Sequence, residues 1–312
     1  MHLAFIGGTR FIGRAAVRRA LEVGHRVSVF HRGEHPCDVA GAVDVLVDRQ
    51  DPSALCAALA RAAPNALIDT RAMTRADAQV TVLAARLLGV PAVVLSSADV
   101  YAQFGRLNGH PAPEPEDCVV ESSALTVPYP FRGLPGDHPP DYDKKDVEHE
   151  LEQAGVPALV LRLPAVYGSG DHRRRFGGVV DRLDAGQRVL PLQGGGTFRH
   201  SHAHVEDVAH AMVLGAERWR EGFAAMNVAE QTTPTMRERV DAIASCMGVG
   251  LEWQEEPGEL PPDLAFLGRM PNDVVLGTAL IRRRLGFDEV TTSDQRVRDL
   301  VTGLRKSRAA PG

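Results

Sequence analysis

Short apolar runs alternate along this chain with longer segments in which apolar residues return every three or four positions. The run HLAFIGG, which begins at His2, is typical of a buried strand. The segment RFIGRAAVRRALEVG follows it with the apolar period of a helix, which Gly24 ends. The same alternation predicts strands at residues 25–32, 42–48, 65–70 and 91–97 and helices at residues 52–64 and 76–90. Strands and helices at this spacing predict a parallel sheet with helices on both faces.

Prolines interrupt this rhythm between residues 102 and 140. The stretch contains eight of them, which predicts a long irregular loop of the kind that often serves as a lid. A helical pattern returns at residues 142–155, followed by a strand with its exit loop at residues 156–168.

The patterning divides the chain into two parts. Residues 1–170 are expected to form a doubly wound α/β domain that carries the lid-like loop. Residues 171–312 show mixed short elements and glycine turns, and are expected to form mostly a smaller C-terminal substrate lobe. A strand–helix pair at about 224–247 is a candidate to return to the first domain.

Composition excludes some classes of function. The formal net charge of −5 makes nucleic acid an unexpected partner, because nucleic-acid binding usually selects a basic face. No apolar run approaches the ~20 residues of a membrane helix, and the N-terminus has no signal-peptide pattern. The four cysteines are well separated, which favours reduced thiols. We expect a cytoplasmic protein, as a monomer or homodimer, whose partners are neither nucleic acid nor a membrane.

The strongest local motif is GGTRFIG, from Gly7 to Gly13, between the first strand and the first helix. Glycines at this place let the backbone turn tightly and approach a pyrophosphate. The helix N-terminus supplies amide donors and the positive end of a dipole. The motif predicts a dinucleotide site.

With this motif the chain resembles the extended short-chain dehydrogenase/reductases, the NAD-dependent epimerase/dehydratase family, whose members carry GxxGxxG here. Arg10 stands in place of the middle glycine. The matching stretches that follow in family order are SSADVY at 96–101, KKDVE at 144–148, RLPAVYGSGD at 162–171, HVEDVAHA at 204–211 and NVAE at 227–230. The resemblance implies a Rossmann-type fold and a nicotinamide cofactor. The cofactor contacts it implies are Gly7, Thr9, Arg10, Phe11, Ile12, Gly13, His31, Arg32, Asp48, Arg49, Thr70, Arg71, Ala72, Ser96, Lys144, Pro164 and Val166.

The second strand indicates which nicotinamide cofactor is bound. Members that prefer NAD hold the adenosine ribose with an acid at the end of this strand, where the present chain has His31 and Arg32. An arginine fork binds the 2′-phosphate of NADP, which a carboxylate would repel. Together with Arg10, these residues favour NADP(H) over NAD(H). The resemblance places Asp48 at the adenine amino group.

The catalytic positions depart from the family pattern. The resemblance implies that Ser97 binds the substrate oxygen and that a Tyr-x-x-x-Lys pair follows. The Val147–Glu148 tail selects Lys144 as the lysine, which places Pro140 at the tyrosine position. In a regular helix Tyr142 lies about 200° around the axis from Lys144, at ~100° per residue. Tyr142 is therefore a weak candidate for proton transfer unless the first turn is bent.

Two further groups of side chains have alternative interpretations. Asp99 replaces the second acid of the pair that dehydratases carry after the serine or threonine, and Ala98 replaces the first. Asp99 is either a base or a cap. His200, His202 and His204 alternate like one face of a strand. We interpret them as strand or turn histidines rather than metal ligands, because no acidic or cysteine partner is evident.

These observations favour an NADPH-dependent ketoreductase that acts on a small-molecule ketone or aldehyde with a non-standard proton donor. Atypical members that reduce aromatic polyketide ketones in antibiotic biosynthesis look similar. Two alternatives remain: a sugar-nucleotide epimerase or dehydratase with bound NAD, and a non-enzymatic NADP-binding or RNA-associated protein.

Overall fold

The central element is a seven-stranded sheet in which every neighbouring pair of strands is parallel. The computed structural model describes residues 1–127, 129–134 and 138–309. The strand order is β10-β6-β5-β4-β1-β2-β3. The strands are β1 (His2–Ile6), β2 (Arg26–His31), β3 (Val43–Leu46), β4 (Ala66–Asp69), β5 (Ala92–Ser97), β6 (Ala158–Leu163) and β10 (Phe223–Asn227). The predicted α/β class and Rossmann-type sheet are confirmed.

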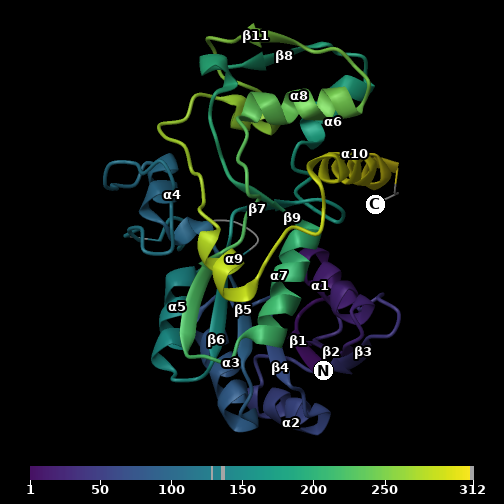
Figure 1. The fold of residues 1–312 in the computed structure, drawn as a ribbon, viewed down its shortest axis with the longest axis vertical. Coiled ribbons are helices and arrows are strands. Elements are labelled where there is room, and N and C mark those ends of the chain that lie inside the picture. Colours follow the sequence, from purple (N-terminus) through teal and green to yellow (C-terminus); the bar gives the residue numbers. More distant parts are fainter. Residues whose placement is uncertain (128, 135–137, 310–312) are drawn as a thin grey trace.

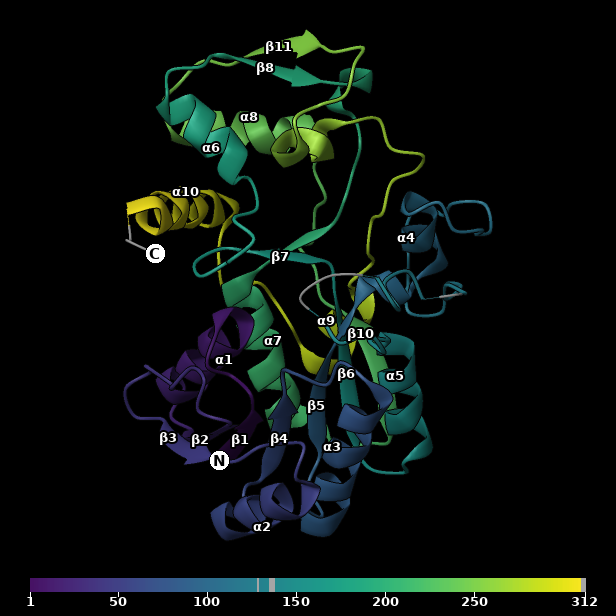
Figure 2. The same cartoon turned by 180° about the vertical axis from the view of Figure 1, so that it is seen from behind.

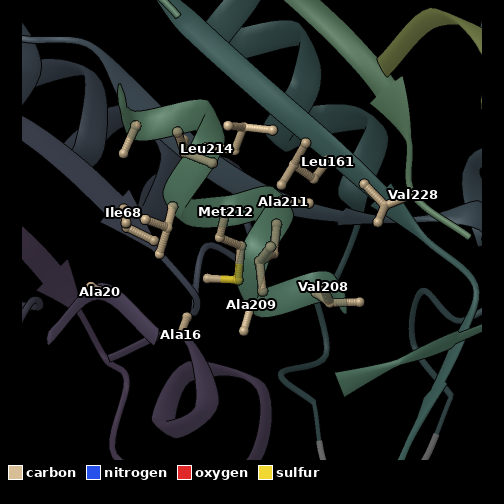
Figure 3. Close-up of a cluster of buried hydrophobic side chains, with 14 of the residues drawn as sticks. Ala16, Ala20, Ile68, Leu161, Val208, Ala209, Ala211, Met212, Leu214 and Val228 are labelled. Carbon is tan, nitrogen blue, oxygen red and sulfur yellow. The ribbon is translucent and has the colours of Figure 1, made fainter. Parts of the chain in front are cut away.

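Helices cover both faces of this sheet, which explains why its strands read as continuous apolar runs. Successive strand residues point to opposite faces, so Phe5 joins one core and Ala4 the other. One face packs against α1 (Phe11–Glu22) and α7 (Val205–Arg218), and the other against α2 (Pro52–Ala62), α3 (Arg75–Leu88) and α5 (Lys144–Gln153). Figure 3 shows α7 presenting Met212 and Ala211 toward the sheet, with Ala16 of α1 close by.

The lobe lies beyond one end of the sheet (Figures 1 and 2). Its own core is apolar and contains Val180, Leu190 and Ile243. Between the lobe and the sheet, β7 (Ala165–Tyr167) pairs in parallel with β9 (His202–His204). The other elements of the lobe are α6 (Gly177–Asp184), β8 (Val189–Leu192), the 3₁₀ helix η2 (Gly194–Gly196), α8 (Met236–Cys246), β11 (Glu252–Glu255), the 3₁₀ helix η3 (Pro262–Leu267) and α10 (Ser293–Ala309).

Part of the range assigned to the lobe belongs to the sheet body. Although residues 171–312 were expected to be mostly lobe, α7 covers the sheet and β10 forms its edge strand beside β6. The predicted pair at 224–247 is split, because β10 returns to the sheet whereas α8 packs in the lobe. Helix α9 (Ala279–Leu285) contacts β10, and its Ile281 lies in the core shared by α1 and α7.

The region expected to be an irregular loop, residues 102–140, contains some regular structure. It begins with α4 (Ala102–Leu107), directly after the 3₁₀ helix η1 (Ala98–Val100). Residue 128 and residues 135–137 lie outside the described part of the chain. Among the described residues, no helix is both long and apolar enough to cross a membrane.

Candidate active site

The glycine loop has the geometry that a phosphate cradle needs. Gly7 and Gly8 have φ values of 82° and 104°, a region that side chains disfavour. A Cβ on Gly13 would lie 2.5 Å from the Gly8 Cα, so the strand and the helix can approach only with glycine there. No side chain caps the first turn of α1, whose amides remain available to an anion. The loop therefore fits a dinucleotide pyrophosphate.

The basic side chains predicted to choose the cofactor lie in this loop and at the end of β2. Arg10 and Arg32 are exposed, and Arg10 Nη1 lies 3.4 Å from His35 Nε2. Two acids that the sequence analysis did not consider are also present. Arg32 is 2.7 Å from Glu34, and His31 Nε2 is 3.1 Å from Asp44. The site thus has two arginine guanidinium groups for a phosphate, and two carboxylates lie next to its basic side chains.

Asp48 and Arg49 differ in their surroundings. Asp48 is exposed, and its carboxylate accepts a hydrogen bond from the Gln50 amide. The Arg49 guanidinium group, predicted to contact the cofactor, is occupied by the carboxylates of Asp69 and Asp77 at 3.0 and 2.9 Å. Burial alone would raise the pKa of Asp69, but Arg49 outweighs it and holds that pKa below its usual value. The Arg49 side chain therefore stabilises the end of β4.

Lys144 lies at the carboxyl edge of the sheet. Its Nζ donates to the carbonyl oxygens of Ala72 and Leu95 at 2.6 and 2.8 Å. Burial lowers the pKa of this ammonium group to about 8. Lys145 instead donates to the Thr126 carbonyl oxygen, in the segment that follows α4. Lys144 is therefore the lysine that faces the ends of β4 and β5.

A buried ion pair fixes the register of α5. Glu148, one turn after Lys144, accepts from the Arg162 guanidinium group of β6 at 2.6 Å and from the Ser96 hydroxyl at 2.5 Å. Arg162 also donates to the Tyr101 hydroxyl at 3.0 Å. This network ties α5 to the strand that ends in Ser97.

Tyr142 is not part of a helix, so the separation of about 200° from Lys144 that a regular helix predicts does not apply. Helix α5 begins at Lys144, because the Asp143 carboxylate caps it by accepting from the amides of Lys145 and Asp146. Tyr142 therefore precedes the helix, and Lys144 Nζ is 5.9 Å from the centre of its ring. Pro140, at the family's tyrosine position, is exposed.

Asp99 lies among these groups. Ala98 and Val100 are buried, whereas Ser97 and Asp99 are half-buried, and the Asp99 amide donates to the Ser97 hydroxyl at 3.3 Å. Burial raises the pKa of Asp99 to about 6, against the lowering effects of the Ser97 hydroxyl, Lys144 and two arginines. The sequence placed Asp99 near Ser97 but gave no sign of this environment.

Tyr129 is a site residue that the sequence analysis missed. It arrives from the lid-like segment, and its ring centre lies 5.4 Å from that of Tyr142. Its hydroxyl is buried and has no hydrogen-bond partner within the described residues. Burial, the Asp99 carboxylate and the Tyr142 hydroxyl all raise its pKa. Only the aromatic character of the loop could have suggested it.

A series of neighbouring aromatic rings extends from the lid-like segment to the histidines of the lobe. Phe104 lies 6.2 Å from Phe131 and 6.1 Å from His200, measured between ring centres. His200 in turn lies 5.3 Å from His202, and burial lowers the pKa of His200 to about 4 and that of His202 well below its usual value. Burial therefore favours the neutral form of the His200 and His202 rings. The described residues contain no group of three or more side chains suited to hold a metal ion.

The other predicted cofactor contacts lie around the same edge of the sheet. Thr70 lies under the glycine loop, where a Cβ on Gly7 would come within 2.6 Å of its Oγ1. The Arg71 amide donates to Asp69, Pro164 lies between β6 and β7, and Val166 is buried in β7. Thr9 and Ile12 belong to the glycine loop and the first turn of α1.

Comparison with known proteins shows the family of this chain. Residues 4–229 match the NAD dependent epimerase/dehydratase family. The chain belongs to this family. This epimerase/dehydratase family member is similar to a Streptomyces reductase, the 3-diazoavenalumate denitrifying reductase, with 28% identity over 235 residues that cover 70% of this chain and 72% of the relative.

Solved structures of the family share its fold. A Campylobacter jejuni UDP-Glc/GlcNAc 4-epimerase superposes with a TM-score of 0.75 at 16% identity, covering 98% of this chain and 99% of the epimerase. A Stenotrophomonas maltophila UDP-glucose-4-epimerase with bound NAD gives 0.74 at 20% identity, covering 99% and 100%. The family member described here is an NAD(P)-dependent enzyme of the oxidoreductase/epimerase–dehydratase type, and its loop geometry fits a nicotinamide cofactor.

Proposed function

We propose that this protein is an NADPH-dependent reductase of a small aromatic carbonyl compound. The observation that supports it best is the pairing of a glycine cradle with Ser97 and Lys144 at one sheet edge, while Ala98 replaces the first acid of the dehydratase pair. Epimerases and dehydratases must move substrate protons and restore their cofactor within each turnover. A reductase needs only a held carbonyl group, a hydride source and one proton.

In the proposed carbonyl reduction, Ser97 and Lys144 would have different roles. Bound NADPH supplies the hydride. The Ser97 hydroxyl donates a hydrogen bond to the carbonyl oxygen, which polarises the carbonyl group and stabilises negative charge on that oxygen. Lys144, already held by two carbonyl oxygens, binds the ribose hydroxyls and fixes the nicotinamide ring beside Ser97.

The aromatic nature of the substrate is inferred from the rings around the site. Phe104, Phe131, Tyr142 and His200 are each partly exposed and come from both the lid-like segment and the lobe. Ring edges and faces of this kind favour a flat aromatic ligand.

A direct experiment follows the hydride. Purified protein is mixed with NADPH deuterated at the transferring position and with phenanthrenequinone or para-hydroxybenzaldehyde. We expect loss of NADPH fluorescence and one deuterium atom on the carbinol carbon of the aldehyde product. Absence of NADPH oxidation with every aromatic carbonyl probe would contradict the proposed reaction.

The preference for NADPH rests on Arg10 and Arg32. Replacing Arg32 with aspartate should weaken NADPH binding about 10–100-fold, or ~1.5–3 kcal/mol, and spare NADH, because only NADP carries the 2′-phosphate. Fluorescence titration with both cofactors measures this. Arg61→Asp makes the same charge change on an exposed residue of α2 and should leave both affinities unchanged. Equal losses of affinity for NADPH and NADH would show that Arg32 does not bind the 2′-phosphate.

A second candidate reaction is the reductive removal of a diazonium group. The Streptomyces relative is named as a denitrifying reductase of a diazo compound. Hydride that replaces dinitrogen on a carbon atom forms the C–H bond and releases N₂ without any proton, which suits a site with Pro140 at the family's tyrosine position. Protein-dependent formation of deuterated benzoic acid from para-carboxybenzenediazonium and deuterated NADPH would identify this activity.

A further inference from the structure

We propose that Asp99 is the proton donor of the site, in place of the tyrosine that the chain lacks at residue 140. This inference rests on the proposed carbonyl reduction and deepens it. Asp99 follows Ser97 by two residues, its amide donates to the Ser97 hydroxyl at 3.3 Å, and both residues are partly exposed beside the buried Ala98 and Val100. A carbonyl oxygen held by the Ser97 hydroxyl would therefore lie beside the Asp99 carboxyl group.

The absence of a cationic partner sets Asp99 apart from other interior carboxylates. Asp69, Glu148, Asp207 and Glu230 each form an ion pair with an arginine at 2.6–3.2 Å. Within the described residues, Asp99 has no lysine, arginine or histidine nitrogen within the 4.0 Å of an ion pair. Interior carboxylates are normally paired, and an unpaired one at a cofactor edge is a candidate for proton transfer.

The groups that face Asp99 come from every element around it. Ser97 belongs to β5 and Lys144 to α5, Tyr129 and Tyr142 come from the lid-like segment and its end, and Arg173 and Arg175 lie in the loop before α6. The positive charges of the lysine and the two arginines stabilise the Asp99 carboxylate that remains after the proton has left. Both phenols have raised pKa values, which burial causes first and Asp99 increases. They therefore stay protonated, and the carboxyl group is the easier source of a proton.

The step balances without a further reactant. Hydride from NADPH forms the new C–H bond at the carbonyl carbon, and the π electrons move to the oxygen. The Asp99 O–H bond breaks as the new alcohol O–H bond forms, which leaves an Asp99 carboxylate and NADP⁺. Asp99 is half-buried, so water can reach it and return the proton.

The test compares Asp99→Asn with the wild type across pH, using NADPH and para-hydroxybenzaldehyde. Because the protonated form acts, the wild-type kcat should fall as pH rises through about 6. Asp99→Asn should lose ~10²–10⁴ in kcat and the falling limb of the profile. Its NADPH affinity should change less than about twofold, which also shows that the variant folds.

Matched variants separate Asp99 from the phenols. Tyr129→Phe and Tyr142→Phe should keep the falling limb and lose less than about tenfold in kcat. The inference about Asp99 would be overturned if Asp99→Asn kept the wild-type kcat–pH profile, or if either phenylalanine variant lost the falling limb. Neither result would overturn the proposed carbonyl reduction. A wild type that oxidises NADPH with none of the carbonyl probes would overturn the proposed function and this inference with it.

Discussion

At the scale of single residues, the two adjacent lysines of α5 have different roles. Lys144 is buried under the carbonyl oxygens of Ala72 and Leu95, and Lys145 reaches toward Thr126. The sequence selected Lys144 over Lys145 from the Val147–Glu148 tail, and the Lys144 ammonium group lies at this edge of the sheet. The predicted helix start at Tyr142 was wrong, since the Asp143 cap starts the helix at residue 144.

The lysine pair gives a matched test of that register. Lys144→Ala should raise the Kd for NADPH or lower kcat at least tenfold, because it removes the cation proposed to bind the ribose. Lys145→Ala should change both constants less than about threefold. Steady-state kinetics and cofactor titration measure both variants. The opposite ranking would mean that Lys145 carries the cofactor contact.

Residues far apart in sequence were the hardest to predict. Tyr129 packs in one apolar cluster with Ala98 and Val100 of η1, and no local pattern encodes that contact between distant parts of the chain. The glycine loop was predictable for the opposite reason, since its turn and the close approach of Gly13 to Gly8 depend on residues within one short stretch.

At the scale of elements, the sheet was predictable because each central strand is buried on both faces and is therefore a continuous apolar run. The elements of the lobe have weaker patterns. Strands β7 and β9 have three residues each, too few to establish a period, and α4 lies in a segment whose prolines favour a loop.

The contact between α5 and β6 depends on the buried ion pair of Glu148 and Arg162. We therefore expect loss of one partner to lower the free energy of unfolding strongly. Arg162→Leu leaves the Glu148 carboxylate buried without a cation and should cost about 3–5 kcal/mol of unfolding free energy in urea titrations. Arg162→Leu combined with Glu148→Leu should recover much of this loss.

A surface ion pair provides the comparison for this prediction. Arg305→Leu removes the exposed partner of Asp184 and should cost less than about 1 kcal/mol. An Arg162→Leu loss as small as that of Arg305→Leu would show that water reaches Glu148 and that the pair is not a structural anchor.

At the scale of the whole molecule, Asp207 connects the sheet body to the segment that leads into the lobe. Its carboxylate, at the first turn of α7, accepts from the amides of Val290 and Thr291 at 2.8 and 3.1 Å and from the Thr291 hydroxyl at 2.7 Å. Arg296 of α10 lies 3.2 Å away. One buried side chain thus holds the entry to the last helix.

Loss of this carboxylate should loosen the C-terminal segment before the sheet. Asp207→Ala should lower the free energy of unfolding by ~1.5–3 kcal/mol, because it removes a buried carboxylate that accepts three charge-assisted hydrogen bonds. Hydrogen exchange should accelerate first at residues 288–297. Asp294→Asn, at an exposed residue of the same segment, should leave the exchange rates unchanged. Uniform acceleration across the sheet would argue against a local tether.

The chain passes between the sheet body and the lobe repeatedly: after β7, before β9, after β10, before α9 and before α10. No single continuous stretch of the sequence therefore encodes the lobe. A recombination event at any single junction would join part of one lobe to part of another and leave both cores incomplete. New substrates in this lineage are thus more readily reached by substitutions within the lobe and the lid-like segment than by exchange of a domain, and protein engineers who graft a foreign lobe must replace several segments at once.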